Sequence, residues 1–110
     1  MKNNPFNPKI EKMTLAEATE NVKKMASNHG GKLQSTVAFD LGEGTIFLDD
    51  TVSPTEISNE SKEAECTIKI DLENFEKLMS GDLNPMMAFM TGKMKVEGDK
   101  GIAMKMSSMF

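Results

Sequence analysis

The chain of 110 residues contains no Arg, no Trp and no Tyr, and it has only one Cys and one His. Arg is the side chain that proteins use most for bidentate contacts to phosphates and to base edges. Its absence, together with a net charge of −4, argues against nucleic acid as the main partner. A single Cys excludes an internal disulfide and a zinc site built from several cysteines.

Long apolar runs are missing as well. No segment approaches the length of about 20 apolar residues that a membrane-spanning helix needs. The first residues, Met1-Lys2-Asn3-Asn4-Pro5, lack the apolar stretch of a secretory signal peptide. We therefore expect an intracellular protein with no secretory signal and no transmembrane segment. A local group of lysines would still allow transient contact with anionic membranes.

Side chains that carry catalysis are few, and none has a plausible partner. His29 precedes a Gly-Gly pair, so we expect a solvated His that interacts with the dipole at the end of a helix. Cys66 shares a strand face with apolar residues and is expected to be buried and inert. Asp49 and Asp50 are neighbours whose side chains diverge on a strand, which predicts a solvated strand end rather than an acid–base pair. We predict no enzyme activity, no cofactor and no metal site.

Methionine is the residue type in excess. The chain has 11 Met, and seven of them lie between Met86 and Met109. Met is flexible and polarizable, and it is over-used on surfaces that accept varied apolar partners. The segment from Met86 to Met90 is apolar on every side, so it is either covered on all faces as core or faces a cavity that a ligand fills. The segment alone favours core, whereas the Met-rich end of the chain favours the cavity.

The order of the expected elements indicates an α+β domain. Residues 1–12 are expected to form a flexible lead-in, and residues 13–110 a single domain. In chain order we predict a helix capped by the Thr14–Glu17 capping box, strands at 33–40 and 45–49, a loop at 51–62 with at most a short edge strand near 55–58, and a strand at 65–70. Helices capped by Asp71 and Asn84, a strand at 93–97 and a helix capped by Asp99 follow.

The stretch from Ala64 to Met106 resembles the C-terminal half of the sterol carrier protein 2 family. A helix ends in Met79-Ser80-Gly81, and the next begins at Leu83-Asn84-Pro85. The strand that follows reads Gly92-Lys93-Met94-Lys95-Val96-Glu97-Gly98-Asp99. These motifs occur in the order that the family shows, and they make the resemblance specific. The N-terminal half fits less specifically, through a capped helix, a Gly-Gly pair and alternating strands.

The resemblance implies a five-stranded sheet with helices packed over one face and an apolar tunnel between the two layers. It implies non-enzymatic binding and intracellular transfer of sterols, fatty acids and fatty acyl-CoA by a monomer in the cytoplasm or peroxisome. The final Ser108-Met109-Phe110 does not match a Ser-Lys-Leu-type peroxisomal signal. Met86 and Thr91 stand where the family often has Gln. The alternative function is a protein-interaction or substrate-presenting module that docks a partner through the Met-rich C-terminal surface.

We expect apolar side chains of the strands and of the later helices to line the lipid cavity. The candidate residues are Phe39, Ile46, Leu48, Ile68, Met79, Leu83, Met86, Phe89, Met90, Met94, Ile102, Met106, Met109 and Phe110. Four of these, Ile102, Met106, Met109 and Phe110, are expected to form a lid at one end of the tunnel. Burying a methylene group contributes about 0.8 kcal/mol, so such a cavity binds long alkyl chains.

Overall fold

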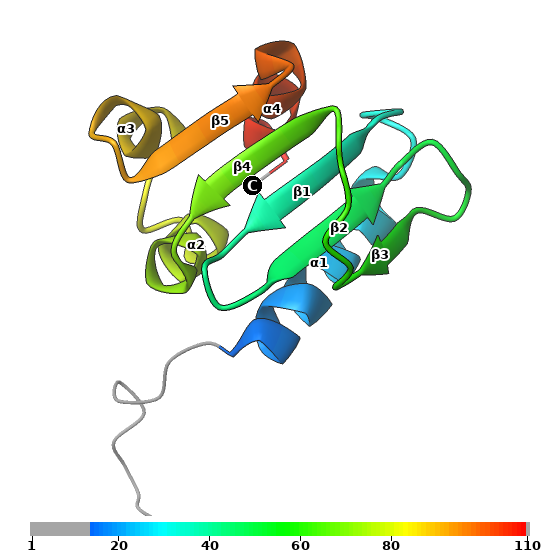
Figure 1. Ribbon diagram of the computed structural model, residues 1–110, viewed down its shortest axis with the longest axis horizontal. Coiled ribbons are helices and arrows are strands. Elements are labelled where there is room, and N and C mark those ends of the chain that lie inside the picture. The colour runs from blue at the N-terminus through cyan, green and yellow to red at the C-terminus, as the bar shows by residue number, and fades with distance from the viewer. Residues whose placement is uncertain (1–13, 110) are drawn as a thin grey trace, which may run out of the picture.

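A computed structural model describes residues 14–109, so the predicted lead-in of residues 1–12 and the terminal Phe110 lie outside the described residues. The strands are β1 (Thr36–Asp40), β2 (Thr45–Asp49), β3 (Glu56–Ser58), β4 (Cys66–Ile70) and β5 (Met94–Gly98). They form one sheet in the order β3-β2-β1-β4-β5 (Figure 1). β1 and β4 pair in parallel, whereas the other neighbouring strands pair antiparallel. The predicted five strands are confirmed.

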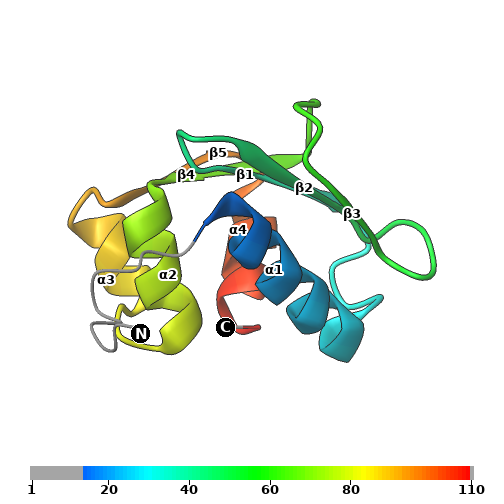
Figure 2. The same ribbon diagram turned by 90° about the horizontal axis from the view of Figure 1, so that it is seen from below.

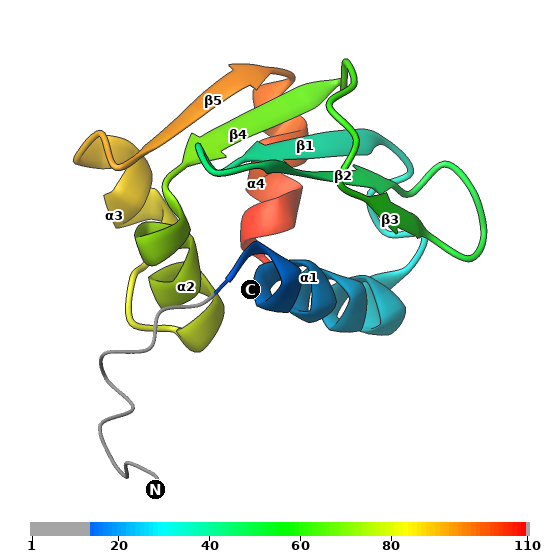
Figure 3. The same cartoon turned by 60° about the horizontal axis from the view of Figure 1, so that its bottom comes forward.

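Helices α1 (Leu15–His29), α2 (Leu72–Ser80), α3 (Pro85–Met90) and α4 (Lys100–Ser107) all lie against one face of this sheet. Figure 2 shows the sheet as the upper layer with the helices beneath it. Figure 3 shows α4 beneath the sheet, between α1 and the α2–α3 pair. The α+β class with helices over one face is thereby confirmed. None of the helices within residues 14–109 has the length and apolar composition needed to cross a membrane.

Side-chain caps set the beginnings of the helices. The Thr14 hydroxyl accepts a hydrogen bond from the Glu17 amide at 3.1 Å, and the Glu17 carboxylate accepts one from the Thr14 amide at 2.9 Å. This is the predicted capping box, and such a cap contributes about 1 kcal/mol. Asp71 caps α2 by accepting from the Asn74 amide at 2.7 Å. Gly81 ends α2 in the left-handed conformation, with φ 87°, which glycine adopts without steric cost.

The core lies between the sheet and the helices. Phe39 of β1 and Phe75 of α2 are fully buried, and their ring centroids are 5.3 Å apart. The largest of the other side chains that are less than 2% exposed are Leu41, Ile46, Leu48, Met106 and Val22. Enclosing side chains of this size contributes about 1.5–3 kcal/mol each. These buried side chains therefore stabilise the packing of the helices against the sheet.

The opposite face of the sheet is polar. Lys69 and Glu97 form an ion pair there at 3.2 Å, on neighbouring strands β4 and β5. Phe47 is the large apolar residue on this face, and it is buried under the Lys62 ammonium, which lies 5.1 Å from the ring centroid. One face of the sheet therefore faces solvent, and the apolar residues of β1, β2 and β4 alternate toward the helices.

Several predicted boundaries differ from the structure, by one to three residues. The strand expected at 33–40 begins only at Thr36, because Gln34 has φ 51° and breaks the extended backbone. The strand expected at 65–70 begins one residue later, and the strand expected at 93–97 lies at Met94–Gly98.

Candidate functional site

An apolar groove lies between α3, β5 and α4. Its volume is about 520 Å³, within the range of roughly 300–1,000 Å³ that small-molecule sites occupy. Its apolar wall comes from Pro85, Met86, Phe89, Met94, Val96, Ala103 and Met104, and its polar part from Asn84, Lys100, Ser107 and Ser108. Lys100 is the only charged residue in this lining. The groove is therefore suited to an elongated apolar molecule with one anionic or polar end.

The wall formed by α3 is unusual because its apolar side chains face outward. Asn84 begins the helix by accepting hydrogen bonds from the Met86 amide at 2.8 Å and the Met87 amide at 3.3 Å. Ala88 is the buried residue of this helix, and its carbonyl accepts from the Lys93 amide at 2.8 Å, which ties α3 to the start of β5. Phe89 remains 46% exposed. The alternative that this segment is covered on all faces as core does not hold, because its Met and Phe side chains are 46–72% exposed.

The facing wall of the groove is formed by α4. The face of this helix that turns away from the groove packs into the core beneath the sheet. The Asp99 carboxylate accepts from the Gly101 amide at 2.8 Å, and the Asp99 amide donates to the Glu65 carbonyl at 2.8 Å. Ile102 and Met106 are buried in the core cluster. Met104, 69% exposed, points away from that cluster and lines the groove. The structure thus gives α4 two different faces, one packed and one open to the groove.

The comparison with known families decides what kind of domain this is. A family model described as "SCP-2 sterol transfer family" matches residues 12–110. The chain belongs to the SCP-2 sterol transfer family. Sterol carrier protein 2 of Homo sapiens is 33% identical over 110 residues, which is 91% of this SCP-2 chain and 18% of the human protein. The chain therefore spans less than a fifth of the length of that relative.

Solved structures of SCP-2 proteins share the fold. The apo form of sterol carrier protein 2 from Yarrowia lipolytica matches with a TM-score of 0.67 at 20% identity, covering 84% of this chain and 82% of that chain. Palmitated SCP2L2 from Aedes aegypti matches with a TM-score of 0.64 at 15% identity, covering 87% and 93%. The resemblance that residues 64–106 carry is confirmed, and the SCP-2 match extends through the N-terminal half.

The residues predicted to line a lipid cavity fall into different environments in the SCP-2 fold. Three of them meet in the groove: Met86, Phe89 and Met94. The buried ones, all in the core cluster, are Phe39, Ile46, Leu48, Ile68, Ile102 and Met106. The partly buried ones that pack against it are Met79, Leu83 and Met109. Met90 is 72% exposed and lies outside the groove lining, and Phe110 lies outside the described residues.

Sequence reasoning missed several groove residues that a clear signal could have found. Lys100, Met104 and Ser107 recur at spacings of four and three, so they share one face of α4. Val96 follows Met94 by two residues and therefore points to the same side of β5. Of the four residues predicted to form a lid, Ile102 and Met106 are buried in the core cluster, Met109 packs against it, and Phe110 lies outside the described residues. The lid stays a prediction. The enclosed tunnel that the resemblance implies stays a prediction.

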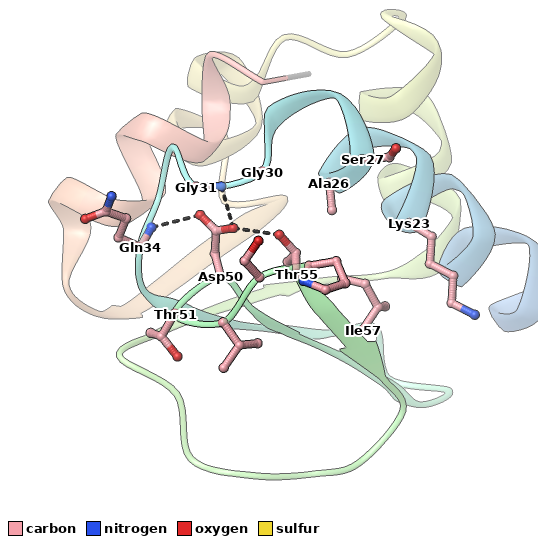
Figure 4. A pocket seen from close by; sticks show the side chains of 13 residues that line it. Lys23, Ala26, Ser27, Gly30, Gly31, Gln34, Asp50, Thr51, Thr55 and Ile57 are labelled. Atoms are coloured by element: carbon pink, nitrogen blue, oxygen red, sulfur yellow. Dashed lines mark hydrogen bonds between the residues drawn. The ribbon is translucent and has the colours of Figure 1, made fainter.

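A second cavity lies between the C-terminal half of α1 and the chain that joins β2 to β3 (Figure 4). Its volume is about 810 Å³, and its lining is Lys23, Ala26, Ser27, Gly30, Gly31, Gln34, Asp50, Thr51, Val52, Ser53, Pro54, Thr55 and Ile57. This lining is rich in hydroxyl and backbone groups. Although the cavity is the larger of the two, its lining is more polar than that of the groove, which makes it a poorer site for a hydrocarbon chain.

Asp50 dominates this second cavity as a structural group. Its carboxylate accepts hydrogen bonds from the amides of Gly31, Leu33 and Gln34, each at 2.8 Å, and from the Thr55 hydroxyl at 2.7 Å. Burial raises the pKa of Asp50, but these four donors outweigh it and hold the pKa below its ordinary value of 3.8. The prediction of a solvated carboxylate is wrong, because the donors come from a distant turn that folding brings to it.

The remaining candidates for chemistry are accounted for by packing. Cys66 is fully buried, as predicted, and burial together with the Asp99 carboxylate raises the pKa of its thiol. A buried thiol with a raised pKa is a poor nucleophile. His29 ends α1, as predicted, with its Nδ1 3.1 Å from the Lys32 Nζ. Within residues 14–109, no three His, Cys, Asp or Glu side chains are grouped so that they could hold a metal ion.

Proposed function

We propose that this SCP-2 domain is a non-enzymatic carrier that binds one lipid in the groove between α3, β5 and α4 and transfers it between membranes. The observation that carries the proposal is the groove itself: about 520 Å³ of space with a wall of Met, Phe and Val side chains and a single charged residue. Unbranched thioether side chains adapt to linear and to bulky apolar ligands. This accommodates fatty acids, acyl-CoA and sterols in one site.

The energetics of an open groove suit a shuttle. Removing a C16 chain completely from water gains roughly 12 kcal/mol, and an open groove covers only part of that chain. After the costs of immobilising the ligand, affinities near micromolar, about −8 kcal/mol, are expected. A membrane is as apolar as the groove, so transfer between the two is close to neutral in free energy. The carrier therefore releases its cargo as readily as it takes it up.

Lys100 gives the site a preference for ligands with an anionic head group. It is exposed at the first turn of α4 and lines the groove beside Met104. An ammonium group at this position attracts a carboxylate or a phosphate, whereas a sterol hydroxyl gains much less from it. We therefore infer that fatty acids and acyl-CoA bind more tightly than sterols. The domain acts as a monomer inside the cell in this proposal, and transient contact with membranes loads and unloads it.

A titration with a fluorescent fatty acid tests the proposal. Binding should saturate near one ligand per chain, and unlabelled palmitate should displace the probe better than hexadecanol of the same length. Lys100→Gln should weaken palmitate by about tenfold, the loss of one charge-assisted contact of about 1.4 kcal/mol, and should leave hexadecanol unchanged. Lys24→Gln, an exposed lysine of α1, is the matched control.

Extraction of the purified protein with organic solvent gives an independent check. Mass spectrometry of the extract should find co-purified lipid. If no lipid is extracted and no lipid class binds saturably, the carrier proposal is wrong, and the Met-rich surface is then a protein-docking surface.

A further inference from the structure

The described chain exposes few large apolar residues, and all but one of them lie on two neighbouring helices. Five of the six lie on α3 and α4: Met86, Met87, Phe89, Met90 and Met104, which are between 46% and 72% exposed. The sixth is Val52, on the chain between β2 and β3. We call these five residues the methionine rim. A contiguous apolar surface on an otherwise polar protein marks an interaction site.

The rim extends beyond the groove that it borders. Successive residues of a helix are rotated by about 100°, so the four rim residues of α3 span roughly 160° of its circumference, with buried Ala88 on the opposite side. Met87 and Met90 are 53% and 72% exposed and take no part in the groove lining. A ligand in the groove would leave these two side chains in water. Only a second surface, in addition to the ligand, would cover them.

The chain segment that carries the rim has a net charge opposite to that of the residues before it. Residues 83–110 carry four Lys and two acidic residues, a net charge of +2, whereas residues 1–82 carry −6. Lys93, Lys100 and Lys105 are exposed and form no ion pair within residues 14–109. The two acidic residues are engaged elsewhere: Glu97 pairs with Lys69 on the polar face of the sheet, and Asp99 caps α4. The rim thus combines apolar side chains with unpaired positive charge.

We propose that the methionine rim is the surface through which this domain docks on an anionic bilayer, with the mouth of the groove facing the membrane. Apolar side chains that enter the head-group region and lysines that approach anionic lipids are the two contributions that hold proteins at this interface. The proposal deepens the proposed function and rests on it for the identity of the cargo. Lipid would then pass between bilayer and groove without crossing water.

Vesicle flotation with the full chain tests the proposal. Vesicles of phosphatidylcholine containing about one third phosphatidylserine should bind the protein, and vesicles of phosphatidylcholine alone should bind it much more weakly. Raising the salt concentration should release it from the anionic vesicles. The double variant Met87→Ser with Met90→Ser should bind anionic vesicles at least about tenfold more weakly. Val52→Ser, an exposed apolar residue near the opposite edge of the sheet, is the matched control and should bind like wild type.

The lysines are tested in the same assay. Lys93→Gln with Lys105→Gln should weaken binding by about fivefold for each lysine. Lys24→Gln with Lys32→Gln, in and just after the C-terminal half of α1, removes the same charge away from the rim and should have little effect.

Fatty-acid titration in solution separates this proposal from the carrier function. The Met87→Ser, Met90→Ser variant should retain the wild-type affinity for a fluorescent fatty acid, since neither residue lines the groove. Unchanged vesicle binding by this variant overturns the docking surface and leaves the carrier function intact. Loss of fatty-acid affinity together with vesicle binding also overturns it, because the rim would then be part of the ligand site. Wild-type protein that ignores anionic vesicles but self-associates through the rim would show a protein partner instead.

Discussion

Beneath the centre of the sheet, Phe39 and Phe75 pack ring against ring with no exposed surface, whereas beside β5 the Phe89 ring is 46% exposed. Both regions are built from apolar residues on the same side of the same sheet. The centre is fully covered by helices, but along the edge strand β5 the short α3 and the open face of α4 leave a groove between them. The difference shows that apolar composition does not determine burial. The position of each covering helix decides which apolar side chains become core and which become a binding surface.

Phe39→Ala is expected to have the largest effect, because it tests the packed side of this comparison. Removing a fully buried ring leaves a cavity next to Phe75, and the free energy of unfolding should fall by about 3–5 kcal/mol. Urea denaturation followed by circular dichroism measures it. A loss below about 1 kcal/mol would mean that the centre of the sheet is as adaptable as its edge.

Asp50→Asn should have the next largest effect. The substitution removes the charge and replaces one acceptor oxygen by an NH2 donor. Each oxygen accepts two of the four hydrogen bonds, so the new donor faces two donors and both of those bonds are lost. The expected loss is about 2–3 kcal/mol in the free energy of unfolding. Asp49→Asn is the matched control, since Asp49 bonds only to its near neighbour Thr51, and it should lose much less. Equal losses would contradict the structural role of Asp50.

The same carboxylate predicts how stability depends on pH. Because the folded state holds the pKa of Asp50 below 3.8, its contribution is complete above pH 3.8 and is lost as the pH falls through the lower folded pKa. Urea midpoints measured from neutral to acidic pH should therefore fall more steeply below about pH 4 in wild type than in Asp50→Asn. Parallel profiles for the two proteins would show that other carboxylates dominate acid unfolding.

Phe89→Ala should have the smallest effect on stability. It tests the open edge of the sheet, as Phe39→Ala tests the packed centre. The ring is half exposed, so the free energy of unfolding should change by less than about 1 kcal/mol. Fatty-acid affinity should fall by about tenfold, or 1.4 kcal/mol, because the ring lines the groove. A large loss of stability with unchanged affinity would place Phe89 in the core and move the ligand site elsewhere.

Much of the fold could be predicted because its signals are local. The caps at Thr14, Asp71, Asn84 and Asp99 act through neighbouring amides, so sequence spacing is sufficient to find them. The alternation of apolar and polar residues along β1 and β2 likewise predicts which of their side chains face the helices. The parallel pairing of β1 with β4 joins segments about 30 positions apart, and no local pattern specifies it. The five-stranded sheet was predicted from the resemblance to the family and not from periodicity.

The site was harder to predict because its signals depend on tertiary contacts. α3 is apolar all round, so periodicity gives no preferred inward face, and the structure is needed to show that Ala88 is the residue that is buried. Asp50 reads as one of two exposed acidic neighbours until the 31–34 turn brings three amide donors to it. In both cases the deciding partner lies outside the window that a sequence pattern covers.

The outward orientation of α3 also sorts the methionines by their exposure to oxidants. Met86, Met87, Met90 and Met104 are more than half exposed, whereas Met25, Met94 and Met106 are 7% exposed or less. Mild peroxide should therefore convert the first group to sulfoxides while the second group stays unmodified, as mass spectrometry of peptides would show. A sulfoxide is polar, and reductases return it to the thioether. Oxidation would therefore make the methionine rim polar, and reduction would make it apolar again. Because these side chains lie outside the core, neither step requires the domain to unfold.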